Sequence, residues 1–444
     1  MIFSRRQVAG TLIRLAAGTL AITIAGAAAP ALAGAAKSVS ATPATGTPQL
    51  SPNGTTEQVR QLVQCGTMMY AVGTFTKISQ GGKVYNRRNA FSFQATAPFT
   101  VSKWRPGVNG EVNSIAFRRG NCFSAYLGGS FSSVHGTRAR NIVKVSTSTG
   151  AVRKRFRRNA GGAVDTLVVH RRHVLAGGFF KSINGSGRNY YASLNSRTGR
   201  DDRYLRLRIS GHYHFPGAAP NRTRIYNQQL SPSGRRLLVE GDFTSVRGKH
   251  REQIFMLRLR PGRARLKRWT SKEFSQACTK DEPFYVRAAS WSPDGSTVYI
   301  ADTGFKPENS SRTAPRTGLC DAAVAFPAAN RSVRHKWINY TGCFSLYSTA
   351  ADASTAYFAG HELYASNPLA CKTAGPGAVF APGMVGLSPA DGSVTFNPTR
   401  SRGIGADDML VTSKGLWIAS DNLAGSDMCG GQHGHAGICF LPYG

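Results

Sequence analysis

The sequence has few acidic residues and only one long apolar run. It holds 22 Asp and Glu against 56 Lys and Arg, a formal net charge of +34 at pH 7. Any partner that it holds electrostatically is therefore expected to be anionic. Charged residues make up 18% of the chain and hydrophobic residues 41%, which argues against a disordered protein. This composition also excludes a collagen, a coiled coil and a multi-span membrane protein.

Familiar catalytic and ligand-binding motifs are absent. The sequence contains no G-x-S-x-G, H-E-x-x-H, Walker loop or dinucleotide fingerprint, so no catalytic residue and no cofactor are assigned. It contains no C-x-x-C pair, which removes the commonest zinc and thioredoxin patterns. Helix-turn-helix, RNP and zinc-finger patterns are also missing, so the sequence does not indicate a nucleic acid as partner.

The single apolar run lies at the N-terminus. Residues 15–31 are weakly apolar, follow three arginines and end at Ala31-Leu32-Ala33, the layout of a secretory signal peptide over residues 1–33. Ser4-Arg5-Arg6-Gln7-Val8 loosely matches a twin-arginine signal, so the Sec and Tat routes both stay open. An uncleaved membrane anchor is the alternative. The mature chain is expected to be secreted, without a transmembrane span, and either free or attached to the cell wall.

Eight cysteines on an exported chain predict disulfides rather than a metal site. Cys65 and Cys122 occupy equivalent turns and are expected to pair, and Cys429 and Cys439 flank one loop. The remaining four admit three pairings, of which Cys278–Cys343 with Cys320–Cys371 is favoured.

A repeat that starts near residue 58 predicts the fold. Each copy begins as an apolar strand, reaches a Gly where backbones crowd, buries a Phe and turns at x-Gly into the next strand. Four tight-turned strands make one propeller blade. The copies are Tyr70-Ala-Val-Gly-Thr-Phe75, Tyr126-Leu-Gly-Gly-Ser-Phe131, Leu175-Ala-Gly-Gly-Phe-Phe180 and Leu238-Val-Glu-Gly-Asp-Phe243.

The position of the crowded Gly recurs seven times, at spacings of 49 to 63 residues. The sequence therefore predicts an all-β, seven-bladed β-propeller with four antiparallel strands per blade. The seven positions are Gly73, Gly129, Gly178, Gly241, Asp302, Gly360 and Ser420.

The termini predict how this ring closes. Only 24 residues follow Ser420, too few for two further strands, so the last blade lacks its outer strand. The segment 48–54 resembles the end of an outer strand and is expected to complete that blade, which leaves no exposed edge. Residues 34–47, rich in Ala, Ser, Thr and Pro, are expected to form a flexible tether, and 48–444 a single domain.

The Gly-Gly-x-Phe-x-Ser-Val-x-Gly unit resembles the delta-60-type β-propeller repeat. Over residues 57–444 the chain is similar to a group of secreted actinobacterial propeller proteins of unassigned function. The resemblance implies the fold and export, and it brings no catalytic motif. Further matching segments are Val112-Asn-Ser-Ile-Ala-Phe117, Trp337-Ile-Asn-Tyr-Thr-Gly342, Gly375-Pro-Gly-Ala-Val379, Phe396-Asn-Pro-Thr-Arg400 and Gly403-Ile-Gly-Ala406.

Positive charge gathers on one part of the chain. Residues 151–210 hold 14 Lys and Arg against three Asp, whereas residues 339–444 hold four against seven acids. Arg153, Arg155, Arg157 and Arg158, on an expected outer strand, are candidate ligands for a phosphate- or carboxylate-bearing polymer. A solvated face that prevents aggregation is the alternative.

Three long loops, Lys306–Leu319, His361–Pro382 and Asn422–Gly437, are expected on one rim of the ring. They bring His361, Glu362, His433 and His435 to that rim as candidate binding residues, without an assigned metal. Loop-ordering hydrogen bonds are the alternative role for these side chains.

The sequence thus predicts a monomeric, exported propeller that acts as a binding or scaffold module for an anionic cell-wall polymer or polysaccharide. A carbohydrate-active lyase or hydrolase with a rim-centred site is one alternative. A purely structural wall-associated protein is the other.

Overall fold

The computed structural model describes residues 38–51, 55–212, 222–275, 284–304, 319–398, 400, 403–423 and 427–444. These residues belong to one compact unit, Lys37–Gly444. The signal-peptide prediction, Cys278 and most of the loop Lys306–Leu319 lie outside them. Within them, secondary structure consists of β-strands and one short 3₁₀ segment, η1 (Lys272–Ser275), so the described part of the chain is all-β. No helix there is long and apolar enough to cross a membrane.

Within the described residues, besides four smaller sheets of two or three short strands, seven larger sheets follow one another along the chain, each an antiparallel meander of three or four strands. In chain order they are β2 (Gln58–Cys65), β3 (Met68–Thr74) and β6 (Ala90–Gln94); β7 (Glu111–Arg118), β8 (Asn121–Ser130) and β11 (Ile142–Ser146); β12 (Ala163–His170), β13 (His173–Phe179) and β14 (Tyr191–Asn195); β16 (Arg224–Leu230), β17 (Arg236–Asp242), β20 (Ile254–Leu259) and β21 (Ala264–Leu266); β22 (Phe284–Trp291), β23 (Thr297–Gly304), β24 (Ala322–Pro327) and β25 (Trp337–Tyr340); β26 (Leu346–Ala351), β27 (Ala356–Gly360), β30 (Val385–Leu387) and β31 (Val394–Phe396); β32 (Asp408–Thr412), β33 (Gly415–Ala419) and β34 (Ile438–Pro442).

Smaller hairpins lie at the outer ends of several sheets. They are formed by β1 (Gln49–Leu50), β4 (Lys77–Gln80) and β5 (Lys83–Asn86); β9 (Ser133–Val134) and β10 (Thr137–Arg138); β15 (Ile209–Ser210), β18 (Ser245–Val246) and β19 (Lys249–His250); and β28 (Tyr364–Ala365) with β29 (Val379–Phe380).

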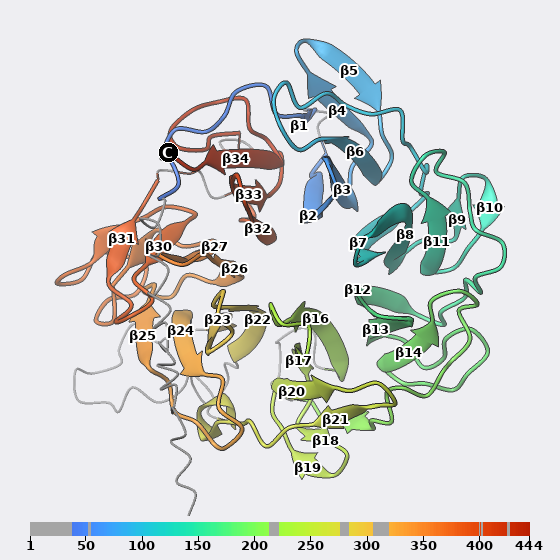
Figure 1. The fold of residues 1–444 in the computed structure, drawn as a ribbon. Helices are drawn as coiled ribbons and strands as arrows, with labels where there is room; N and C mark the ends of the chain where they lie inside the picture. Colours follow the sequence, from blue (N-terminus) through green and yellow to red (C-terminus); the bar gives the residue numbers. More distant parts are fainter. Residues whose placement is uncertain are drawn as a thin grey trace, which may run out of the picture. The chain divides into compact units, whose positions relative to one another are not determined.

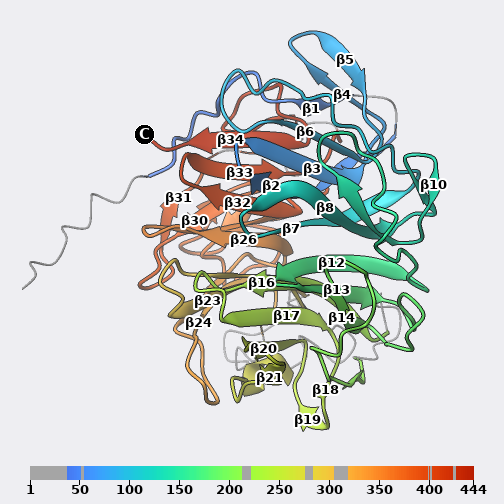
Figure 2. The same cartoon turned by 45° about the vertical axis from the view of Figure 1, so that its right-hand side comes forward.

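The seven larger sheets stand radially around a common centre, with the first strand of each sheet innermost (Figure 1). Each innermost strand contacts the innermost strand of the next sheet, and β32 of the last sheet contacts β2 of the first. Figure 2 shows the neighbouring sheets stacked face to face. Meander sheets arranged in this way define a β-propeller.

The predicted Gly-Phe unit has the structural role that its pattern indicates. A Cβ on Gly73 would lie 2.0 Å from the Gln58 carbonyl oxygen, and one on Gly241 2.1 Å from that of Arg224. Only glycine tolerates this approach between the first two strands of a sheet. The Phe two residues later is buried in all four clear repeats, at Phe75, Phe131, Phe180 and Phe243.

The predicted x-Gly turns are also present. His135 and Gly136, between β9 and β10, have φ values of 48° and 69°, and Arg247 and Gly248, between β18 and β19, have 54° and 70°. Two consecutive residues with positive φ match the twist of a tight hairpin, which is why Gly stands second.

Apolar side chains fill the spaces between sheets. Between the last and the first sheet, the ring of Trp417 stacks on Phe440 at a centroid distance of 4.3 Å and lies 5.6 Å from Phe93. Val59, Phe91 and their neighbours complete this cluster. The two ends of the described chain therefore share one apolar core.

The N-terminal segment differs from its prediction. The N–H of Ser40 donates to the carbonyl of Pro442 at 2.7 Å, and that of Ala44 donates to Phe440 at 2.9 Å. Residues 39–44, expected to be part of a flexible tether, thus lie along β34 and bury Val39. Gln49 and Leu50, from the segment expected in that place, instead form β1, which pairs with β4 in the small sheet of β1, β4 and β5. The backbone groups at the outer edge of β34 need hydrogen-bond partners, and residues 39–44 supply them.

Three disulfides lie within the described residues. Cys65–Cys122 and Cys429–Cys439 are confirmed. Cys343 pairs with Cys371, not with Cys278 as favoured from the sequence. Cys320 is also disulfide-bonded.

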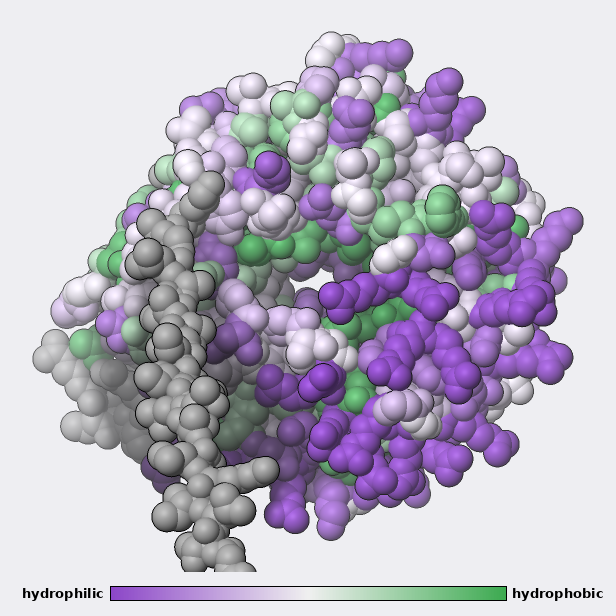
Figure 3. Space-filling model, viewed as in Figure 1, coloured by the Kyte–Doolittle hydropathy of each residue, from purple (hydrophilic) through white to green (hydrophobic). Residues whose placement is uncertain are grey.

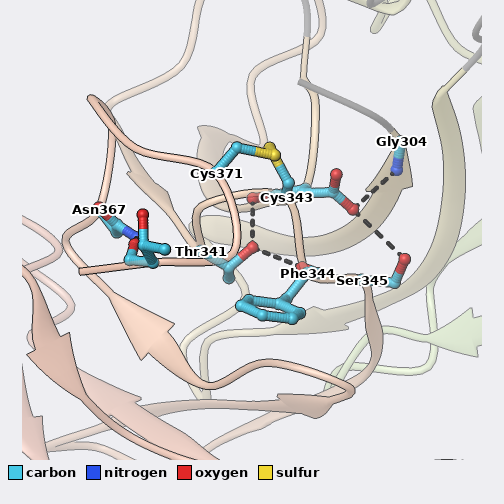
Figure 4. Close-up of a disulfide and its surroundings, with 9 residues drawn as sticks. Gly304, Thr341, Cys343, Phe344, Ser345, Asn367 and Cys371 are labelled. Carbon is cyan, nitrogen blue, oxygen red and sulfur yellow. Dashed lines mark hydrogen bonds between the residues drawn. A yellow bond between two sulfur atoms is a disulfide. The ribbon is translucent and has the colours of Figure 1, made fainter. Parts of the chain in front are cut away.

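The Cys343–Cys371 bridge joins the loop after β25 to the loop between β28 and β29 (Figure 4). Beside it, the Thr341 hydroxyl donates to the carbonyl oxygens of Asp321 and Phe344, and the Asp321 carboxylate accepts from the Gly304 N–H at 2.9 Å. The turn that carries Cys343 is therefore already ordered by hydrogen bonds, and it meets the loop of the neighbouring sheet that carries Cys371.

Candidate functional site: a polar cavity at the centre of the sheets

Six of the seven innermost strands carry a shift of register at the same place, directly after the residue that pairs with the crowded position of the second strand. In each, one extra residue is inserted opposite the second strand. Such a β-bulge re-aims a side chain. The inserted residues are Arg60, Asn113, Asp165, Tyr226, Arg287 and Tyr347.

All six inserted residues line one cavity of about 460 Å³. Asp407 and Asp408, at the start of β32, complete its wall from the seventh sheet. The space-filling view shows an opening at the centre of the sheets (Figure 3). The bulges therefore direct polar side chains from six sheets toward the centre, and Asp407 and Asp408 add the seventh.

Two carboxylates hold Arg60 at one side of the cavity. Its Nη1 lies 2.9 Å from Oδ2 of Asp407, and its Nε lies 3.1 Å from Oε1 of Glu111. Burial raises the pKa of Asp407, against the opposing effect of Arg60. This chain of charges links the seventh, first and second sheets.

A second ion pair lies across the cavity. Arg224 donates through Nε and Nη2 to the two carboxylate oxygens of Asp165, at 2.6 and 2.7 Å. Asn113 donates to the same carboxylate at 3.2 Å. Burial is the main influence on Asp165 and raises its pKa, although Arg224 acts in the other direction. Two-point pairing of this kind fixes the orientation of both side chains.

Arg287 differs from these two arginines. Its guanidinium lies over the rings of Tyr226 and Tyr347, 5.7 and 5.5 Å from their centroids. Among the residues that the structure describes, it forms no ion pair. A guanidinium between aromatic faces keeps its hydrogen-bond donors available for a ligand.

Asp408 is a further carboxyl group of the cavity whose pKa is raised. Burial raises its pKa to about 7, and the nearby charge of Asp407 acts in the same direction, although the Leu62 N–H donates to Asp408 at 2.9 Å. A carboxyl group with this pKa exchanges its proton near neutral pH.

The predicted arginine cluster lies elsewhere, in the turn between β11 and β12 rather than on an outer strand. Phe156 is buried against Tyr126, and the arginines around it face outward. Arg157 donates to the carbonyl of Asn184 at 3.2 Å and Arg158 to that of Arg138 at 2.9 Å. Arg153 and Arg155 are exposed. The four arginines thus share a surface that is separate from the central cavity.

The predicted rim group does not form one cluster. Glu362 is fully buried, where its charge acts on Arg400. His435 is 4% exposed, with Nδ1 3.4 Å from the Thr47 hydroxyl, and its burial lowers its pKa. His433 is exposed and lies 2.9 Å from Asp427.

His361 is partly buried, and its backbone N–H donates to the Ser345 carbonyl at 2.7 Å. Within the described ranges, no group of three or more His, Cys, Asp or Glu side chains is arranged to hold a metal ion.

Comparisons with known proteins give no closer assignment. No protein-family model and no curated protein matches the chain. Among solved structures, the WD40 β-propeller domain of Doa1 is similar with a TM-score of 0.44 and 11% identity, over 89% of this chain and 96% of that one. BamB from Moraxella catarrhalis is similar with a TM-score of 0.42 and 11% identity, over 89% and 99%. At these scores the likeness says nothing about function, and the β-propeller fold rests on the sheet topology above.

Proposed function

We propose that this protein is an exported, seven-bladed β-propeller that binds a polar ligand in its central cavity. The seven sheets and the contact between β2 and β32 support a closed ring. The bonds from residues 39–44 to β34 support closure by the N-terminal segment, which acts as the missing outer strand. The disulfides and the N-terminal apolar run support export, since disulfides persist outside the cytosol. We expect the protein to be a monomer.

The observation that carries the binding proposal is Arg287, which has no ion pair within the described part of the chain, in a cavity where Arg60 and Arg224 are each paired with carboxylates. Seven strands each present a polar side chain there, so the cavity has donors, acceptors and two aromatic faces. This combination suits a hydroxyl- and carboxylate-bearing ligand such as an acidic sugar, because each ring face covers apolar sugar carbons while Arg287 pairs with the carboxylate.

The basic flank supplies a second, electrostatic contribution. It is the exposed part of residues 151–210, where hydrophilic side chains gather around β12–β14 in Figure 3. The three acids of this range are already paired, Asp165 with Arg224, Asp201 with Arg188 and Asp202 with His173. The exposed cations are therefore free to attract an anionic polymer or surface toward the protein. They are Arg153, Lys154, Arg155, Arg157, Arg171, Arg172, Lys181, Arg197, Arg200, Arg203, Arg206 and Arg208.

A carbohydrate-active enzyme is a second candidate function. Asp408 favours it, because a carboxyl group with a pKa of about 7 in a polar cavity suits proton donation to a leaving sugar. Turnover of a bound polysaccharide that disappears in Asp408→Asn, with binding kept, would establish the enzyme. Binding without turnover would leave the protein a binding module. If the protein is a purely structural wall protein, neither binding nor turnover of a polysaccharide is expected.

The test is a binding screen of the mature protein against cell-wall polymers, neutral and acidic polysaccharides and anionic vesicles, at low and high salt. For the best ligand, Arg287→Gln is expected to weaken binding about 10- to 100-fold, because a charge-assisted hydrogen bond contributes about 1.5–3 kcal/mol. Arg265→Gln, an exposed arginine of β21, is the matched control. Equal affinity of the Arg287→Gln variant and the wild type would reject the central cavity as the site.

The basic flank is tested in the same screen by charge reversal at Arg155 and Arg157, matched by reversal at Arg258 and Arg263. If the flank contains a discrete site, the first pair weakens retention on anionic material more than the second, and the effect decreases as salt rises. Equal losses would leave net charge as the only cause.

A further inference from the structure

A second cavity, of about 630 Å³, lies between the outer parts of the first and second sheets. It is lined from the start of β4, the end of β5, the segment between β5 and β6, the loop after β6 and the β9–β10 turn. Its lining includes Lys77, Arg87, Arg88, Arg105 and His135, and no acidic residue. Glu57, whose carboxylate accepts from the N–H and the hydroxyl of Thr76, is not part of the lining. The cavity therefore concentrates positive charge without a built-in counter-charge.

Arg87 is the most confined of these cations, with only 8% of its surface exposed. Its Nη1 and Nη2 donate to the carbonyls of Asn86 and Ser102 at 3.0 and 2.8 Å. Its buried Nε has no acceptor among the residues that the structure describes. Burial and the charge of Arg105 both lower the pKa of Arg87. A buried, charged donor without an acceptor is costly unless a ligand satisfies it.

The third repeat shows what satisfies the equivalent arginine. Asn89 and Tyr190 are equivalent, since their N–H groups donate to the carbonyls of Phe75 and Phe180. Arg87 and Arg188 stand two residues earlier in their repeats. The Nε of Arg188 donates to the carboxylate of Asp201 at 2.6 Å.

In the first repeat, the carboxylate is absent. The bridges Phe93↔Val101 and Leu194↔Asp201 make Val101 the equivalent of Asp201. The first repeat therefore has an apolar residue where the third has an anion, together with a cavity and three further Lys and Arg side chains.

The fourth repeat shows which of these features are common to the repeats and which are particular to the cavity. Arg251 holds the same two-carbonyl arrangement as Arg87, with bonds to His250 and Lys267, and a buried Nε without an acceptor among the described residues. A buried Nε without an acceptor is therefore a feature of the repeat, and by itself it does not indicate an anion site. What distinguishes the first repeat is the surrounding group of exposed cations.

We propose that this cavity binds a tetrahedral oxyanion, phosphate or sulfate, held by Arg88, Arg105 and Lys77 above the buried Arg87. The proposal rests on these residues alone and is independent of the function proposed for the central cavity. Guanidinium groups match the oxygens of such an anion in pairs. The anion takes the part that Asp201 has in the third repeat.

The experiment is a calorimetric titration of the mature protein with inorganic phosphate, inorganic sulfate and acetate at low salt. The wild type is expected to bind phosphate and sulfate at one site, at least tenfold more tightly than acetate. The double variant Arg88→Ala/Arg105→Ala is expected to bind phosphate at least tenfold more weakly. Both side chains are exposed, so the fold is kept.

The matched control is Arg258→Ala/Arg263→Ala, which removes the same charge from exposed positions in the fourth sheet. Equal weakening in both double variants, or acetate binding as tight as phosphate binding, would overturn the proposal. Val101→Asp supplies the carboxylate of the third repeat and is expected to stop phosphate binding with all cations kept. Undiminished binding by the folded Val101→Asp protein would also overturn it.

Discussion

The ion pair between Arg224 and Asp165 provides the sharpest test of how the central cavity is held together. Arg224→Leu removes the two hydrogen bonds of 2.6 and 2.7 Å and leaves Asp165, whose side chain is 7% exposed, with only Asn113 as a donor. Removing one partner of a buried pair costs about 3–5 kcal/mol. With an unfolding entropy of about 2.1 cal/mol/K per residue, this lowers the melting temperature by about 4–6 °C for a unit spanning Lys37–Gly444.

The pH dependence identifies the cause of this loss. Burial already raises the pKa of Asp165 above its unfolded value, and removal of Arg224 raises it further. A raised carboxyl pKa means that the folded state binds more protons than the unfolded state, so stability falls as pH rises. The loss in Arg224→Leu is therefore expected to be larger at pH 8 than at pH 5, measured by urea unfolding at both.

The double variant Arg224→Leu/Asp165→Asn is the control, because a neutral amide carries no charge to be left unpaired. It is expected to recover much of the stability at pH 8. An equal loss at pH 5 and pH 8, or no recovery in the double variant, would refute the assignment of Asp165 as a buried charge stabilised by Arg224.

Three further predictions follow from the same structure. Replacing Cys343 and Cys371 by Ser opens a loop of 28 residues and is expected to cost about 3–4 kcal/mol of unfolding free energy; a melting temperature equal to that of the wild type would contradict it. Because burial raises the pKa of Asp408 to about 7, wild-type stability should decline between about pH 4 and pH 7, and Asp408→Asn should flatten this decline in urea titrations; parallel profiles would count against it. Deleting residues 38–44 exposes the edge of β34 and should lower the thermal stability of the mature protein, whereas an unchanged melting curve would show that these bonds are not needed.

The repeat pattern was sufficient to predict most of the fold. The crowded Gly73 and Gly241, the buried Phe beside them and the x-Gly turns each have a backbone reason that a sequence shows directly. The pairings Cys65–Cys122 and Cys429–Cys439 followed from equivalent turns and from a short loop.

Other features depend on tertiary contacts that composition does not encode. Residues 39–44 have the Ser, Ala and Thr content of a linker, and only the unpaired edge of β34 makes them a strand-like segment. For Cys343 the sequence leaves three partners open and favours Cys278, whereas the pairing with Cys371 depends on the path of the intervening loop.

The central cavity was missed although the sequence carries a signal for it. Near the start of five of the six bulged strands, two polar residues in succession break the alternation of apolar and polar positions, as in Val59-Arg60-Gln61 and Val164-Asp165-Thr166. This break marks the bulge that turns a polar residue inward. His361 and the other rim histidines, which are rarer residues, favoured the loops over the strands as the predicted site.

A crystal structure with the best ligand from the binding screen tests most directly whether the ligand binds among the bulged residues. Ligand density is expected in the 460 Å³ cavity, in contact with Arg287 between Tyr226 and Tyr347. Density for that ligand on the outer face of the sheets, with the cavity filled only by water, would contradict it.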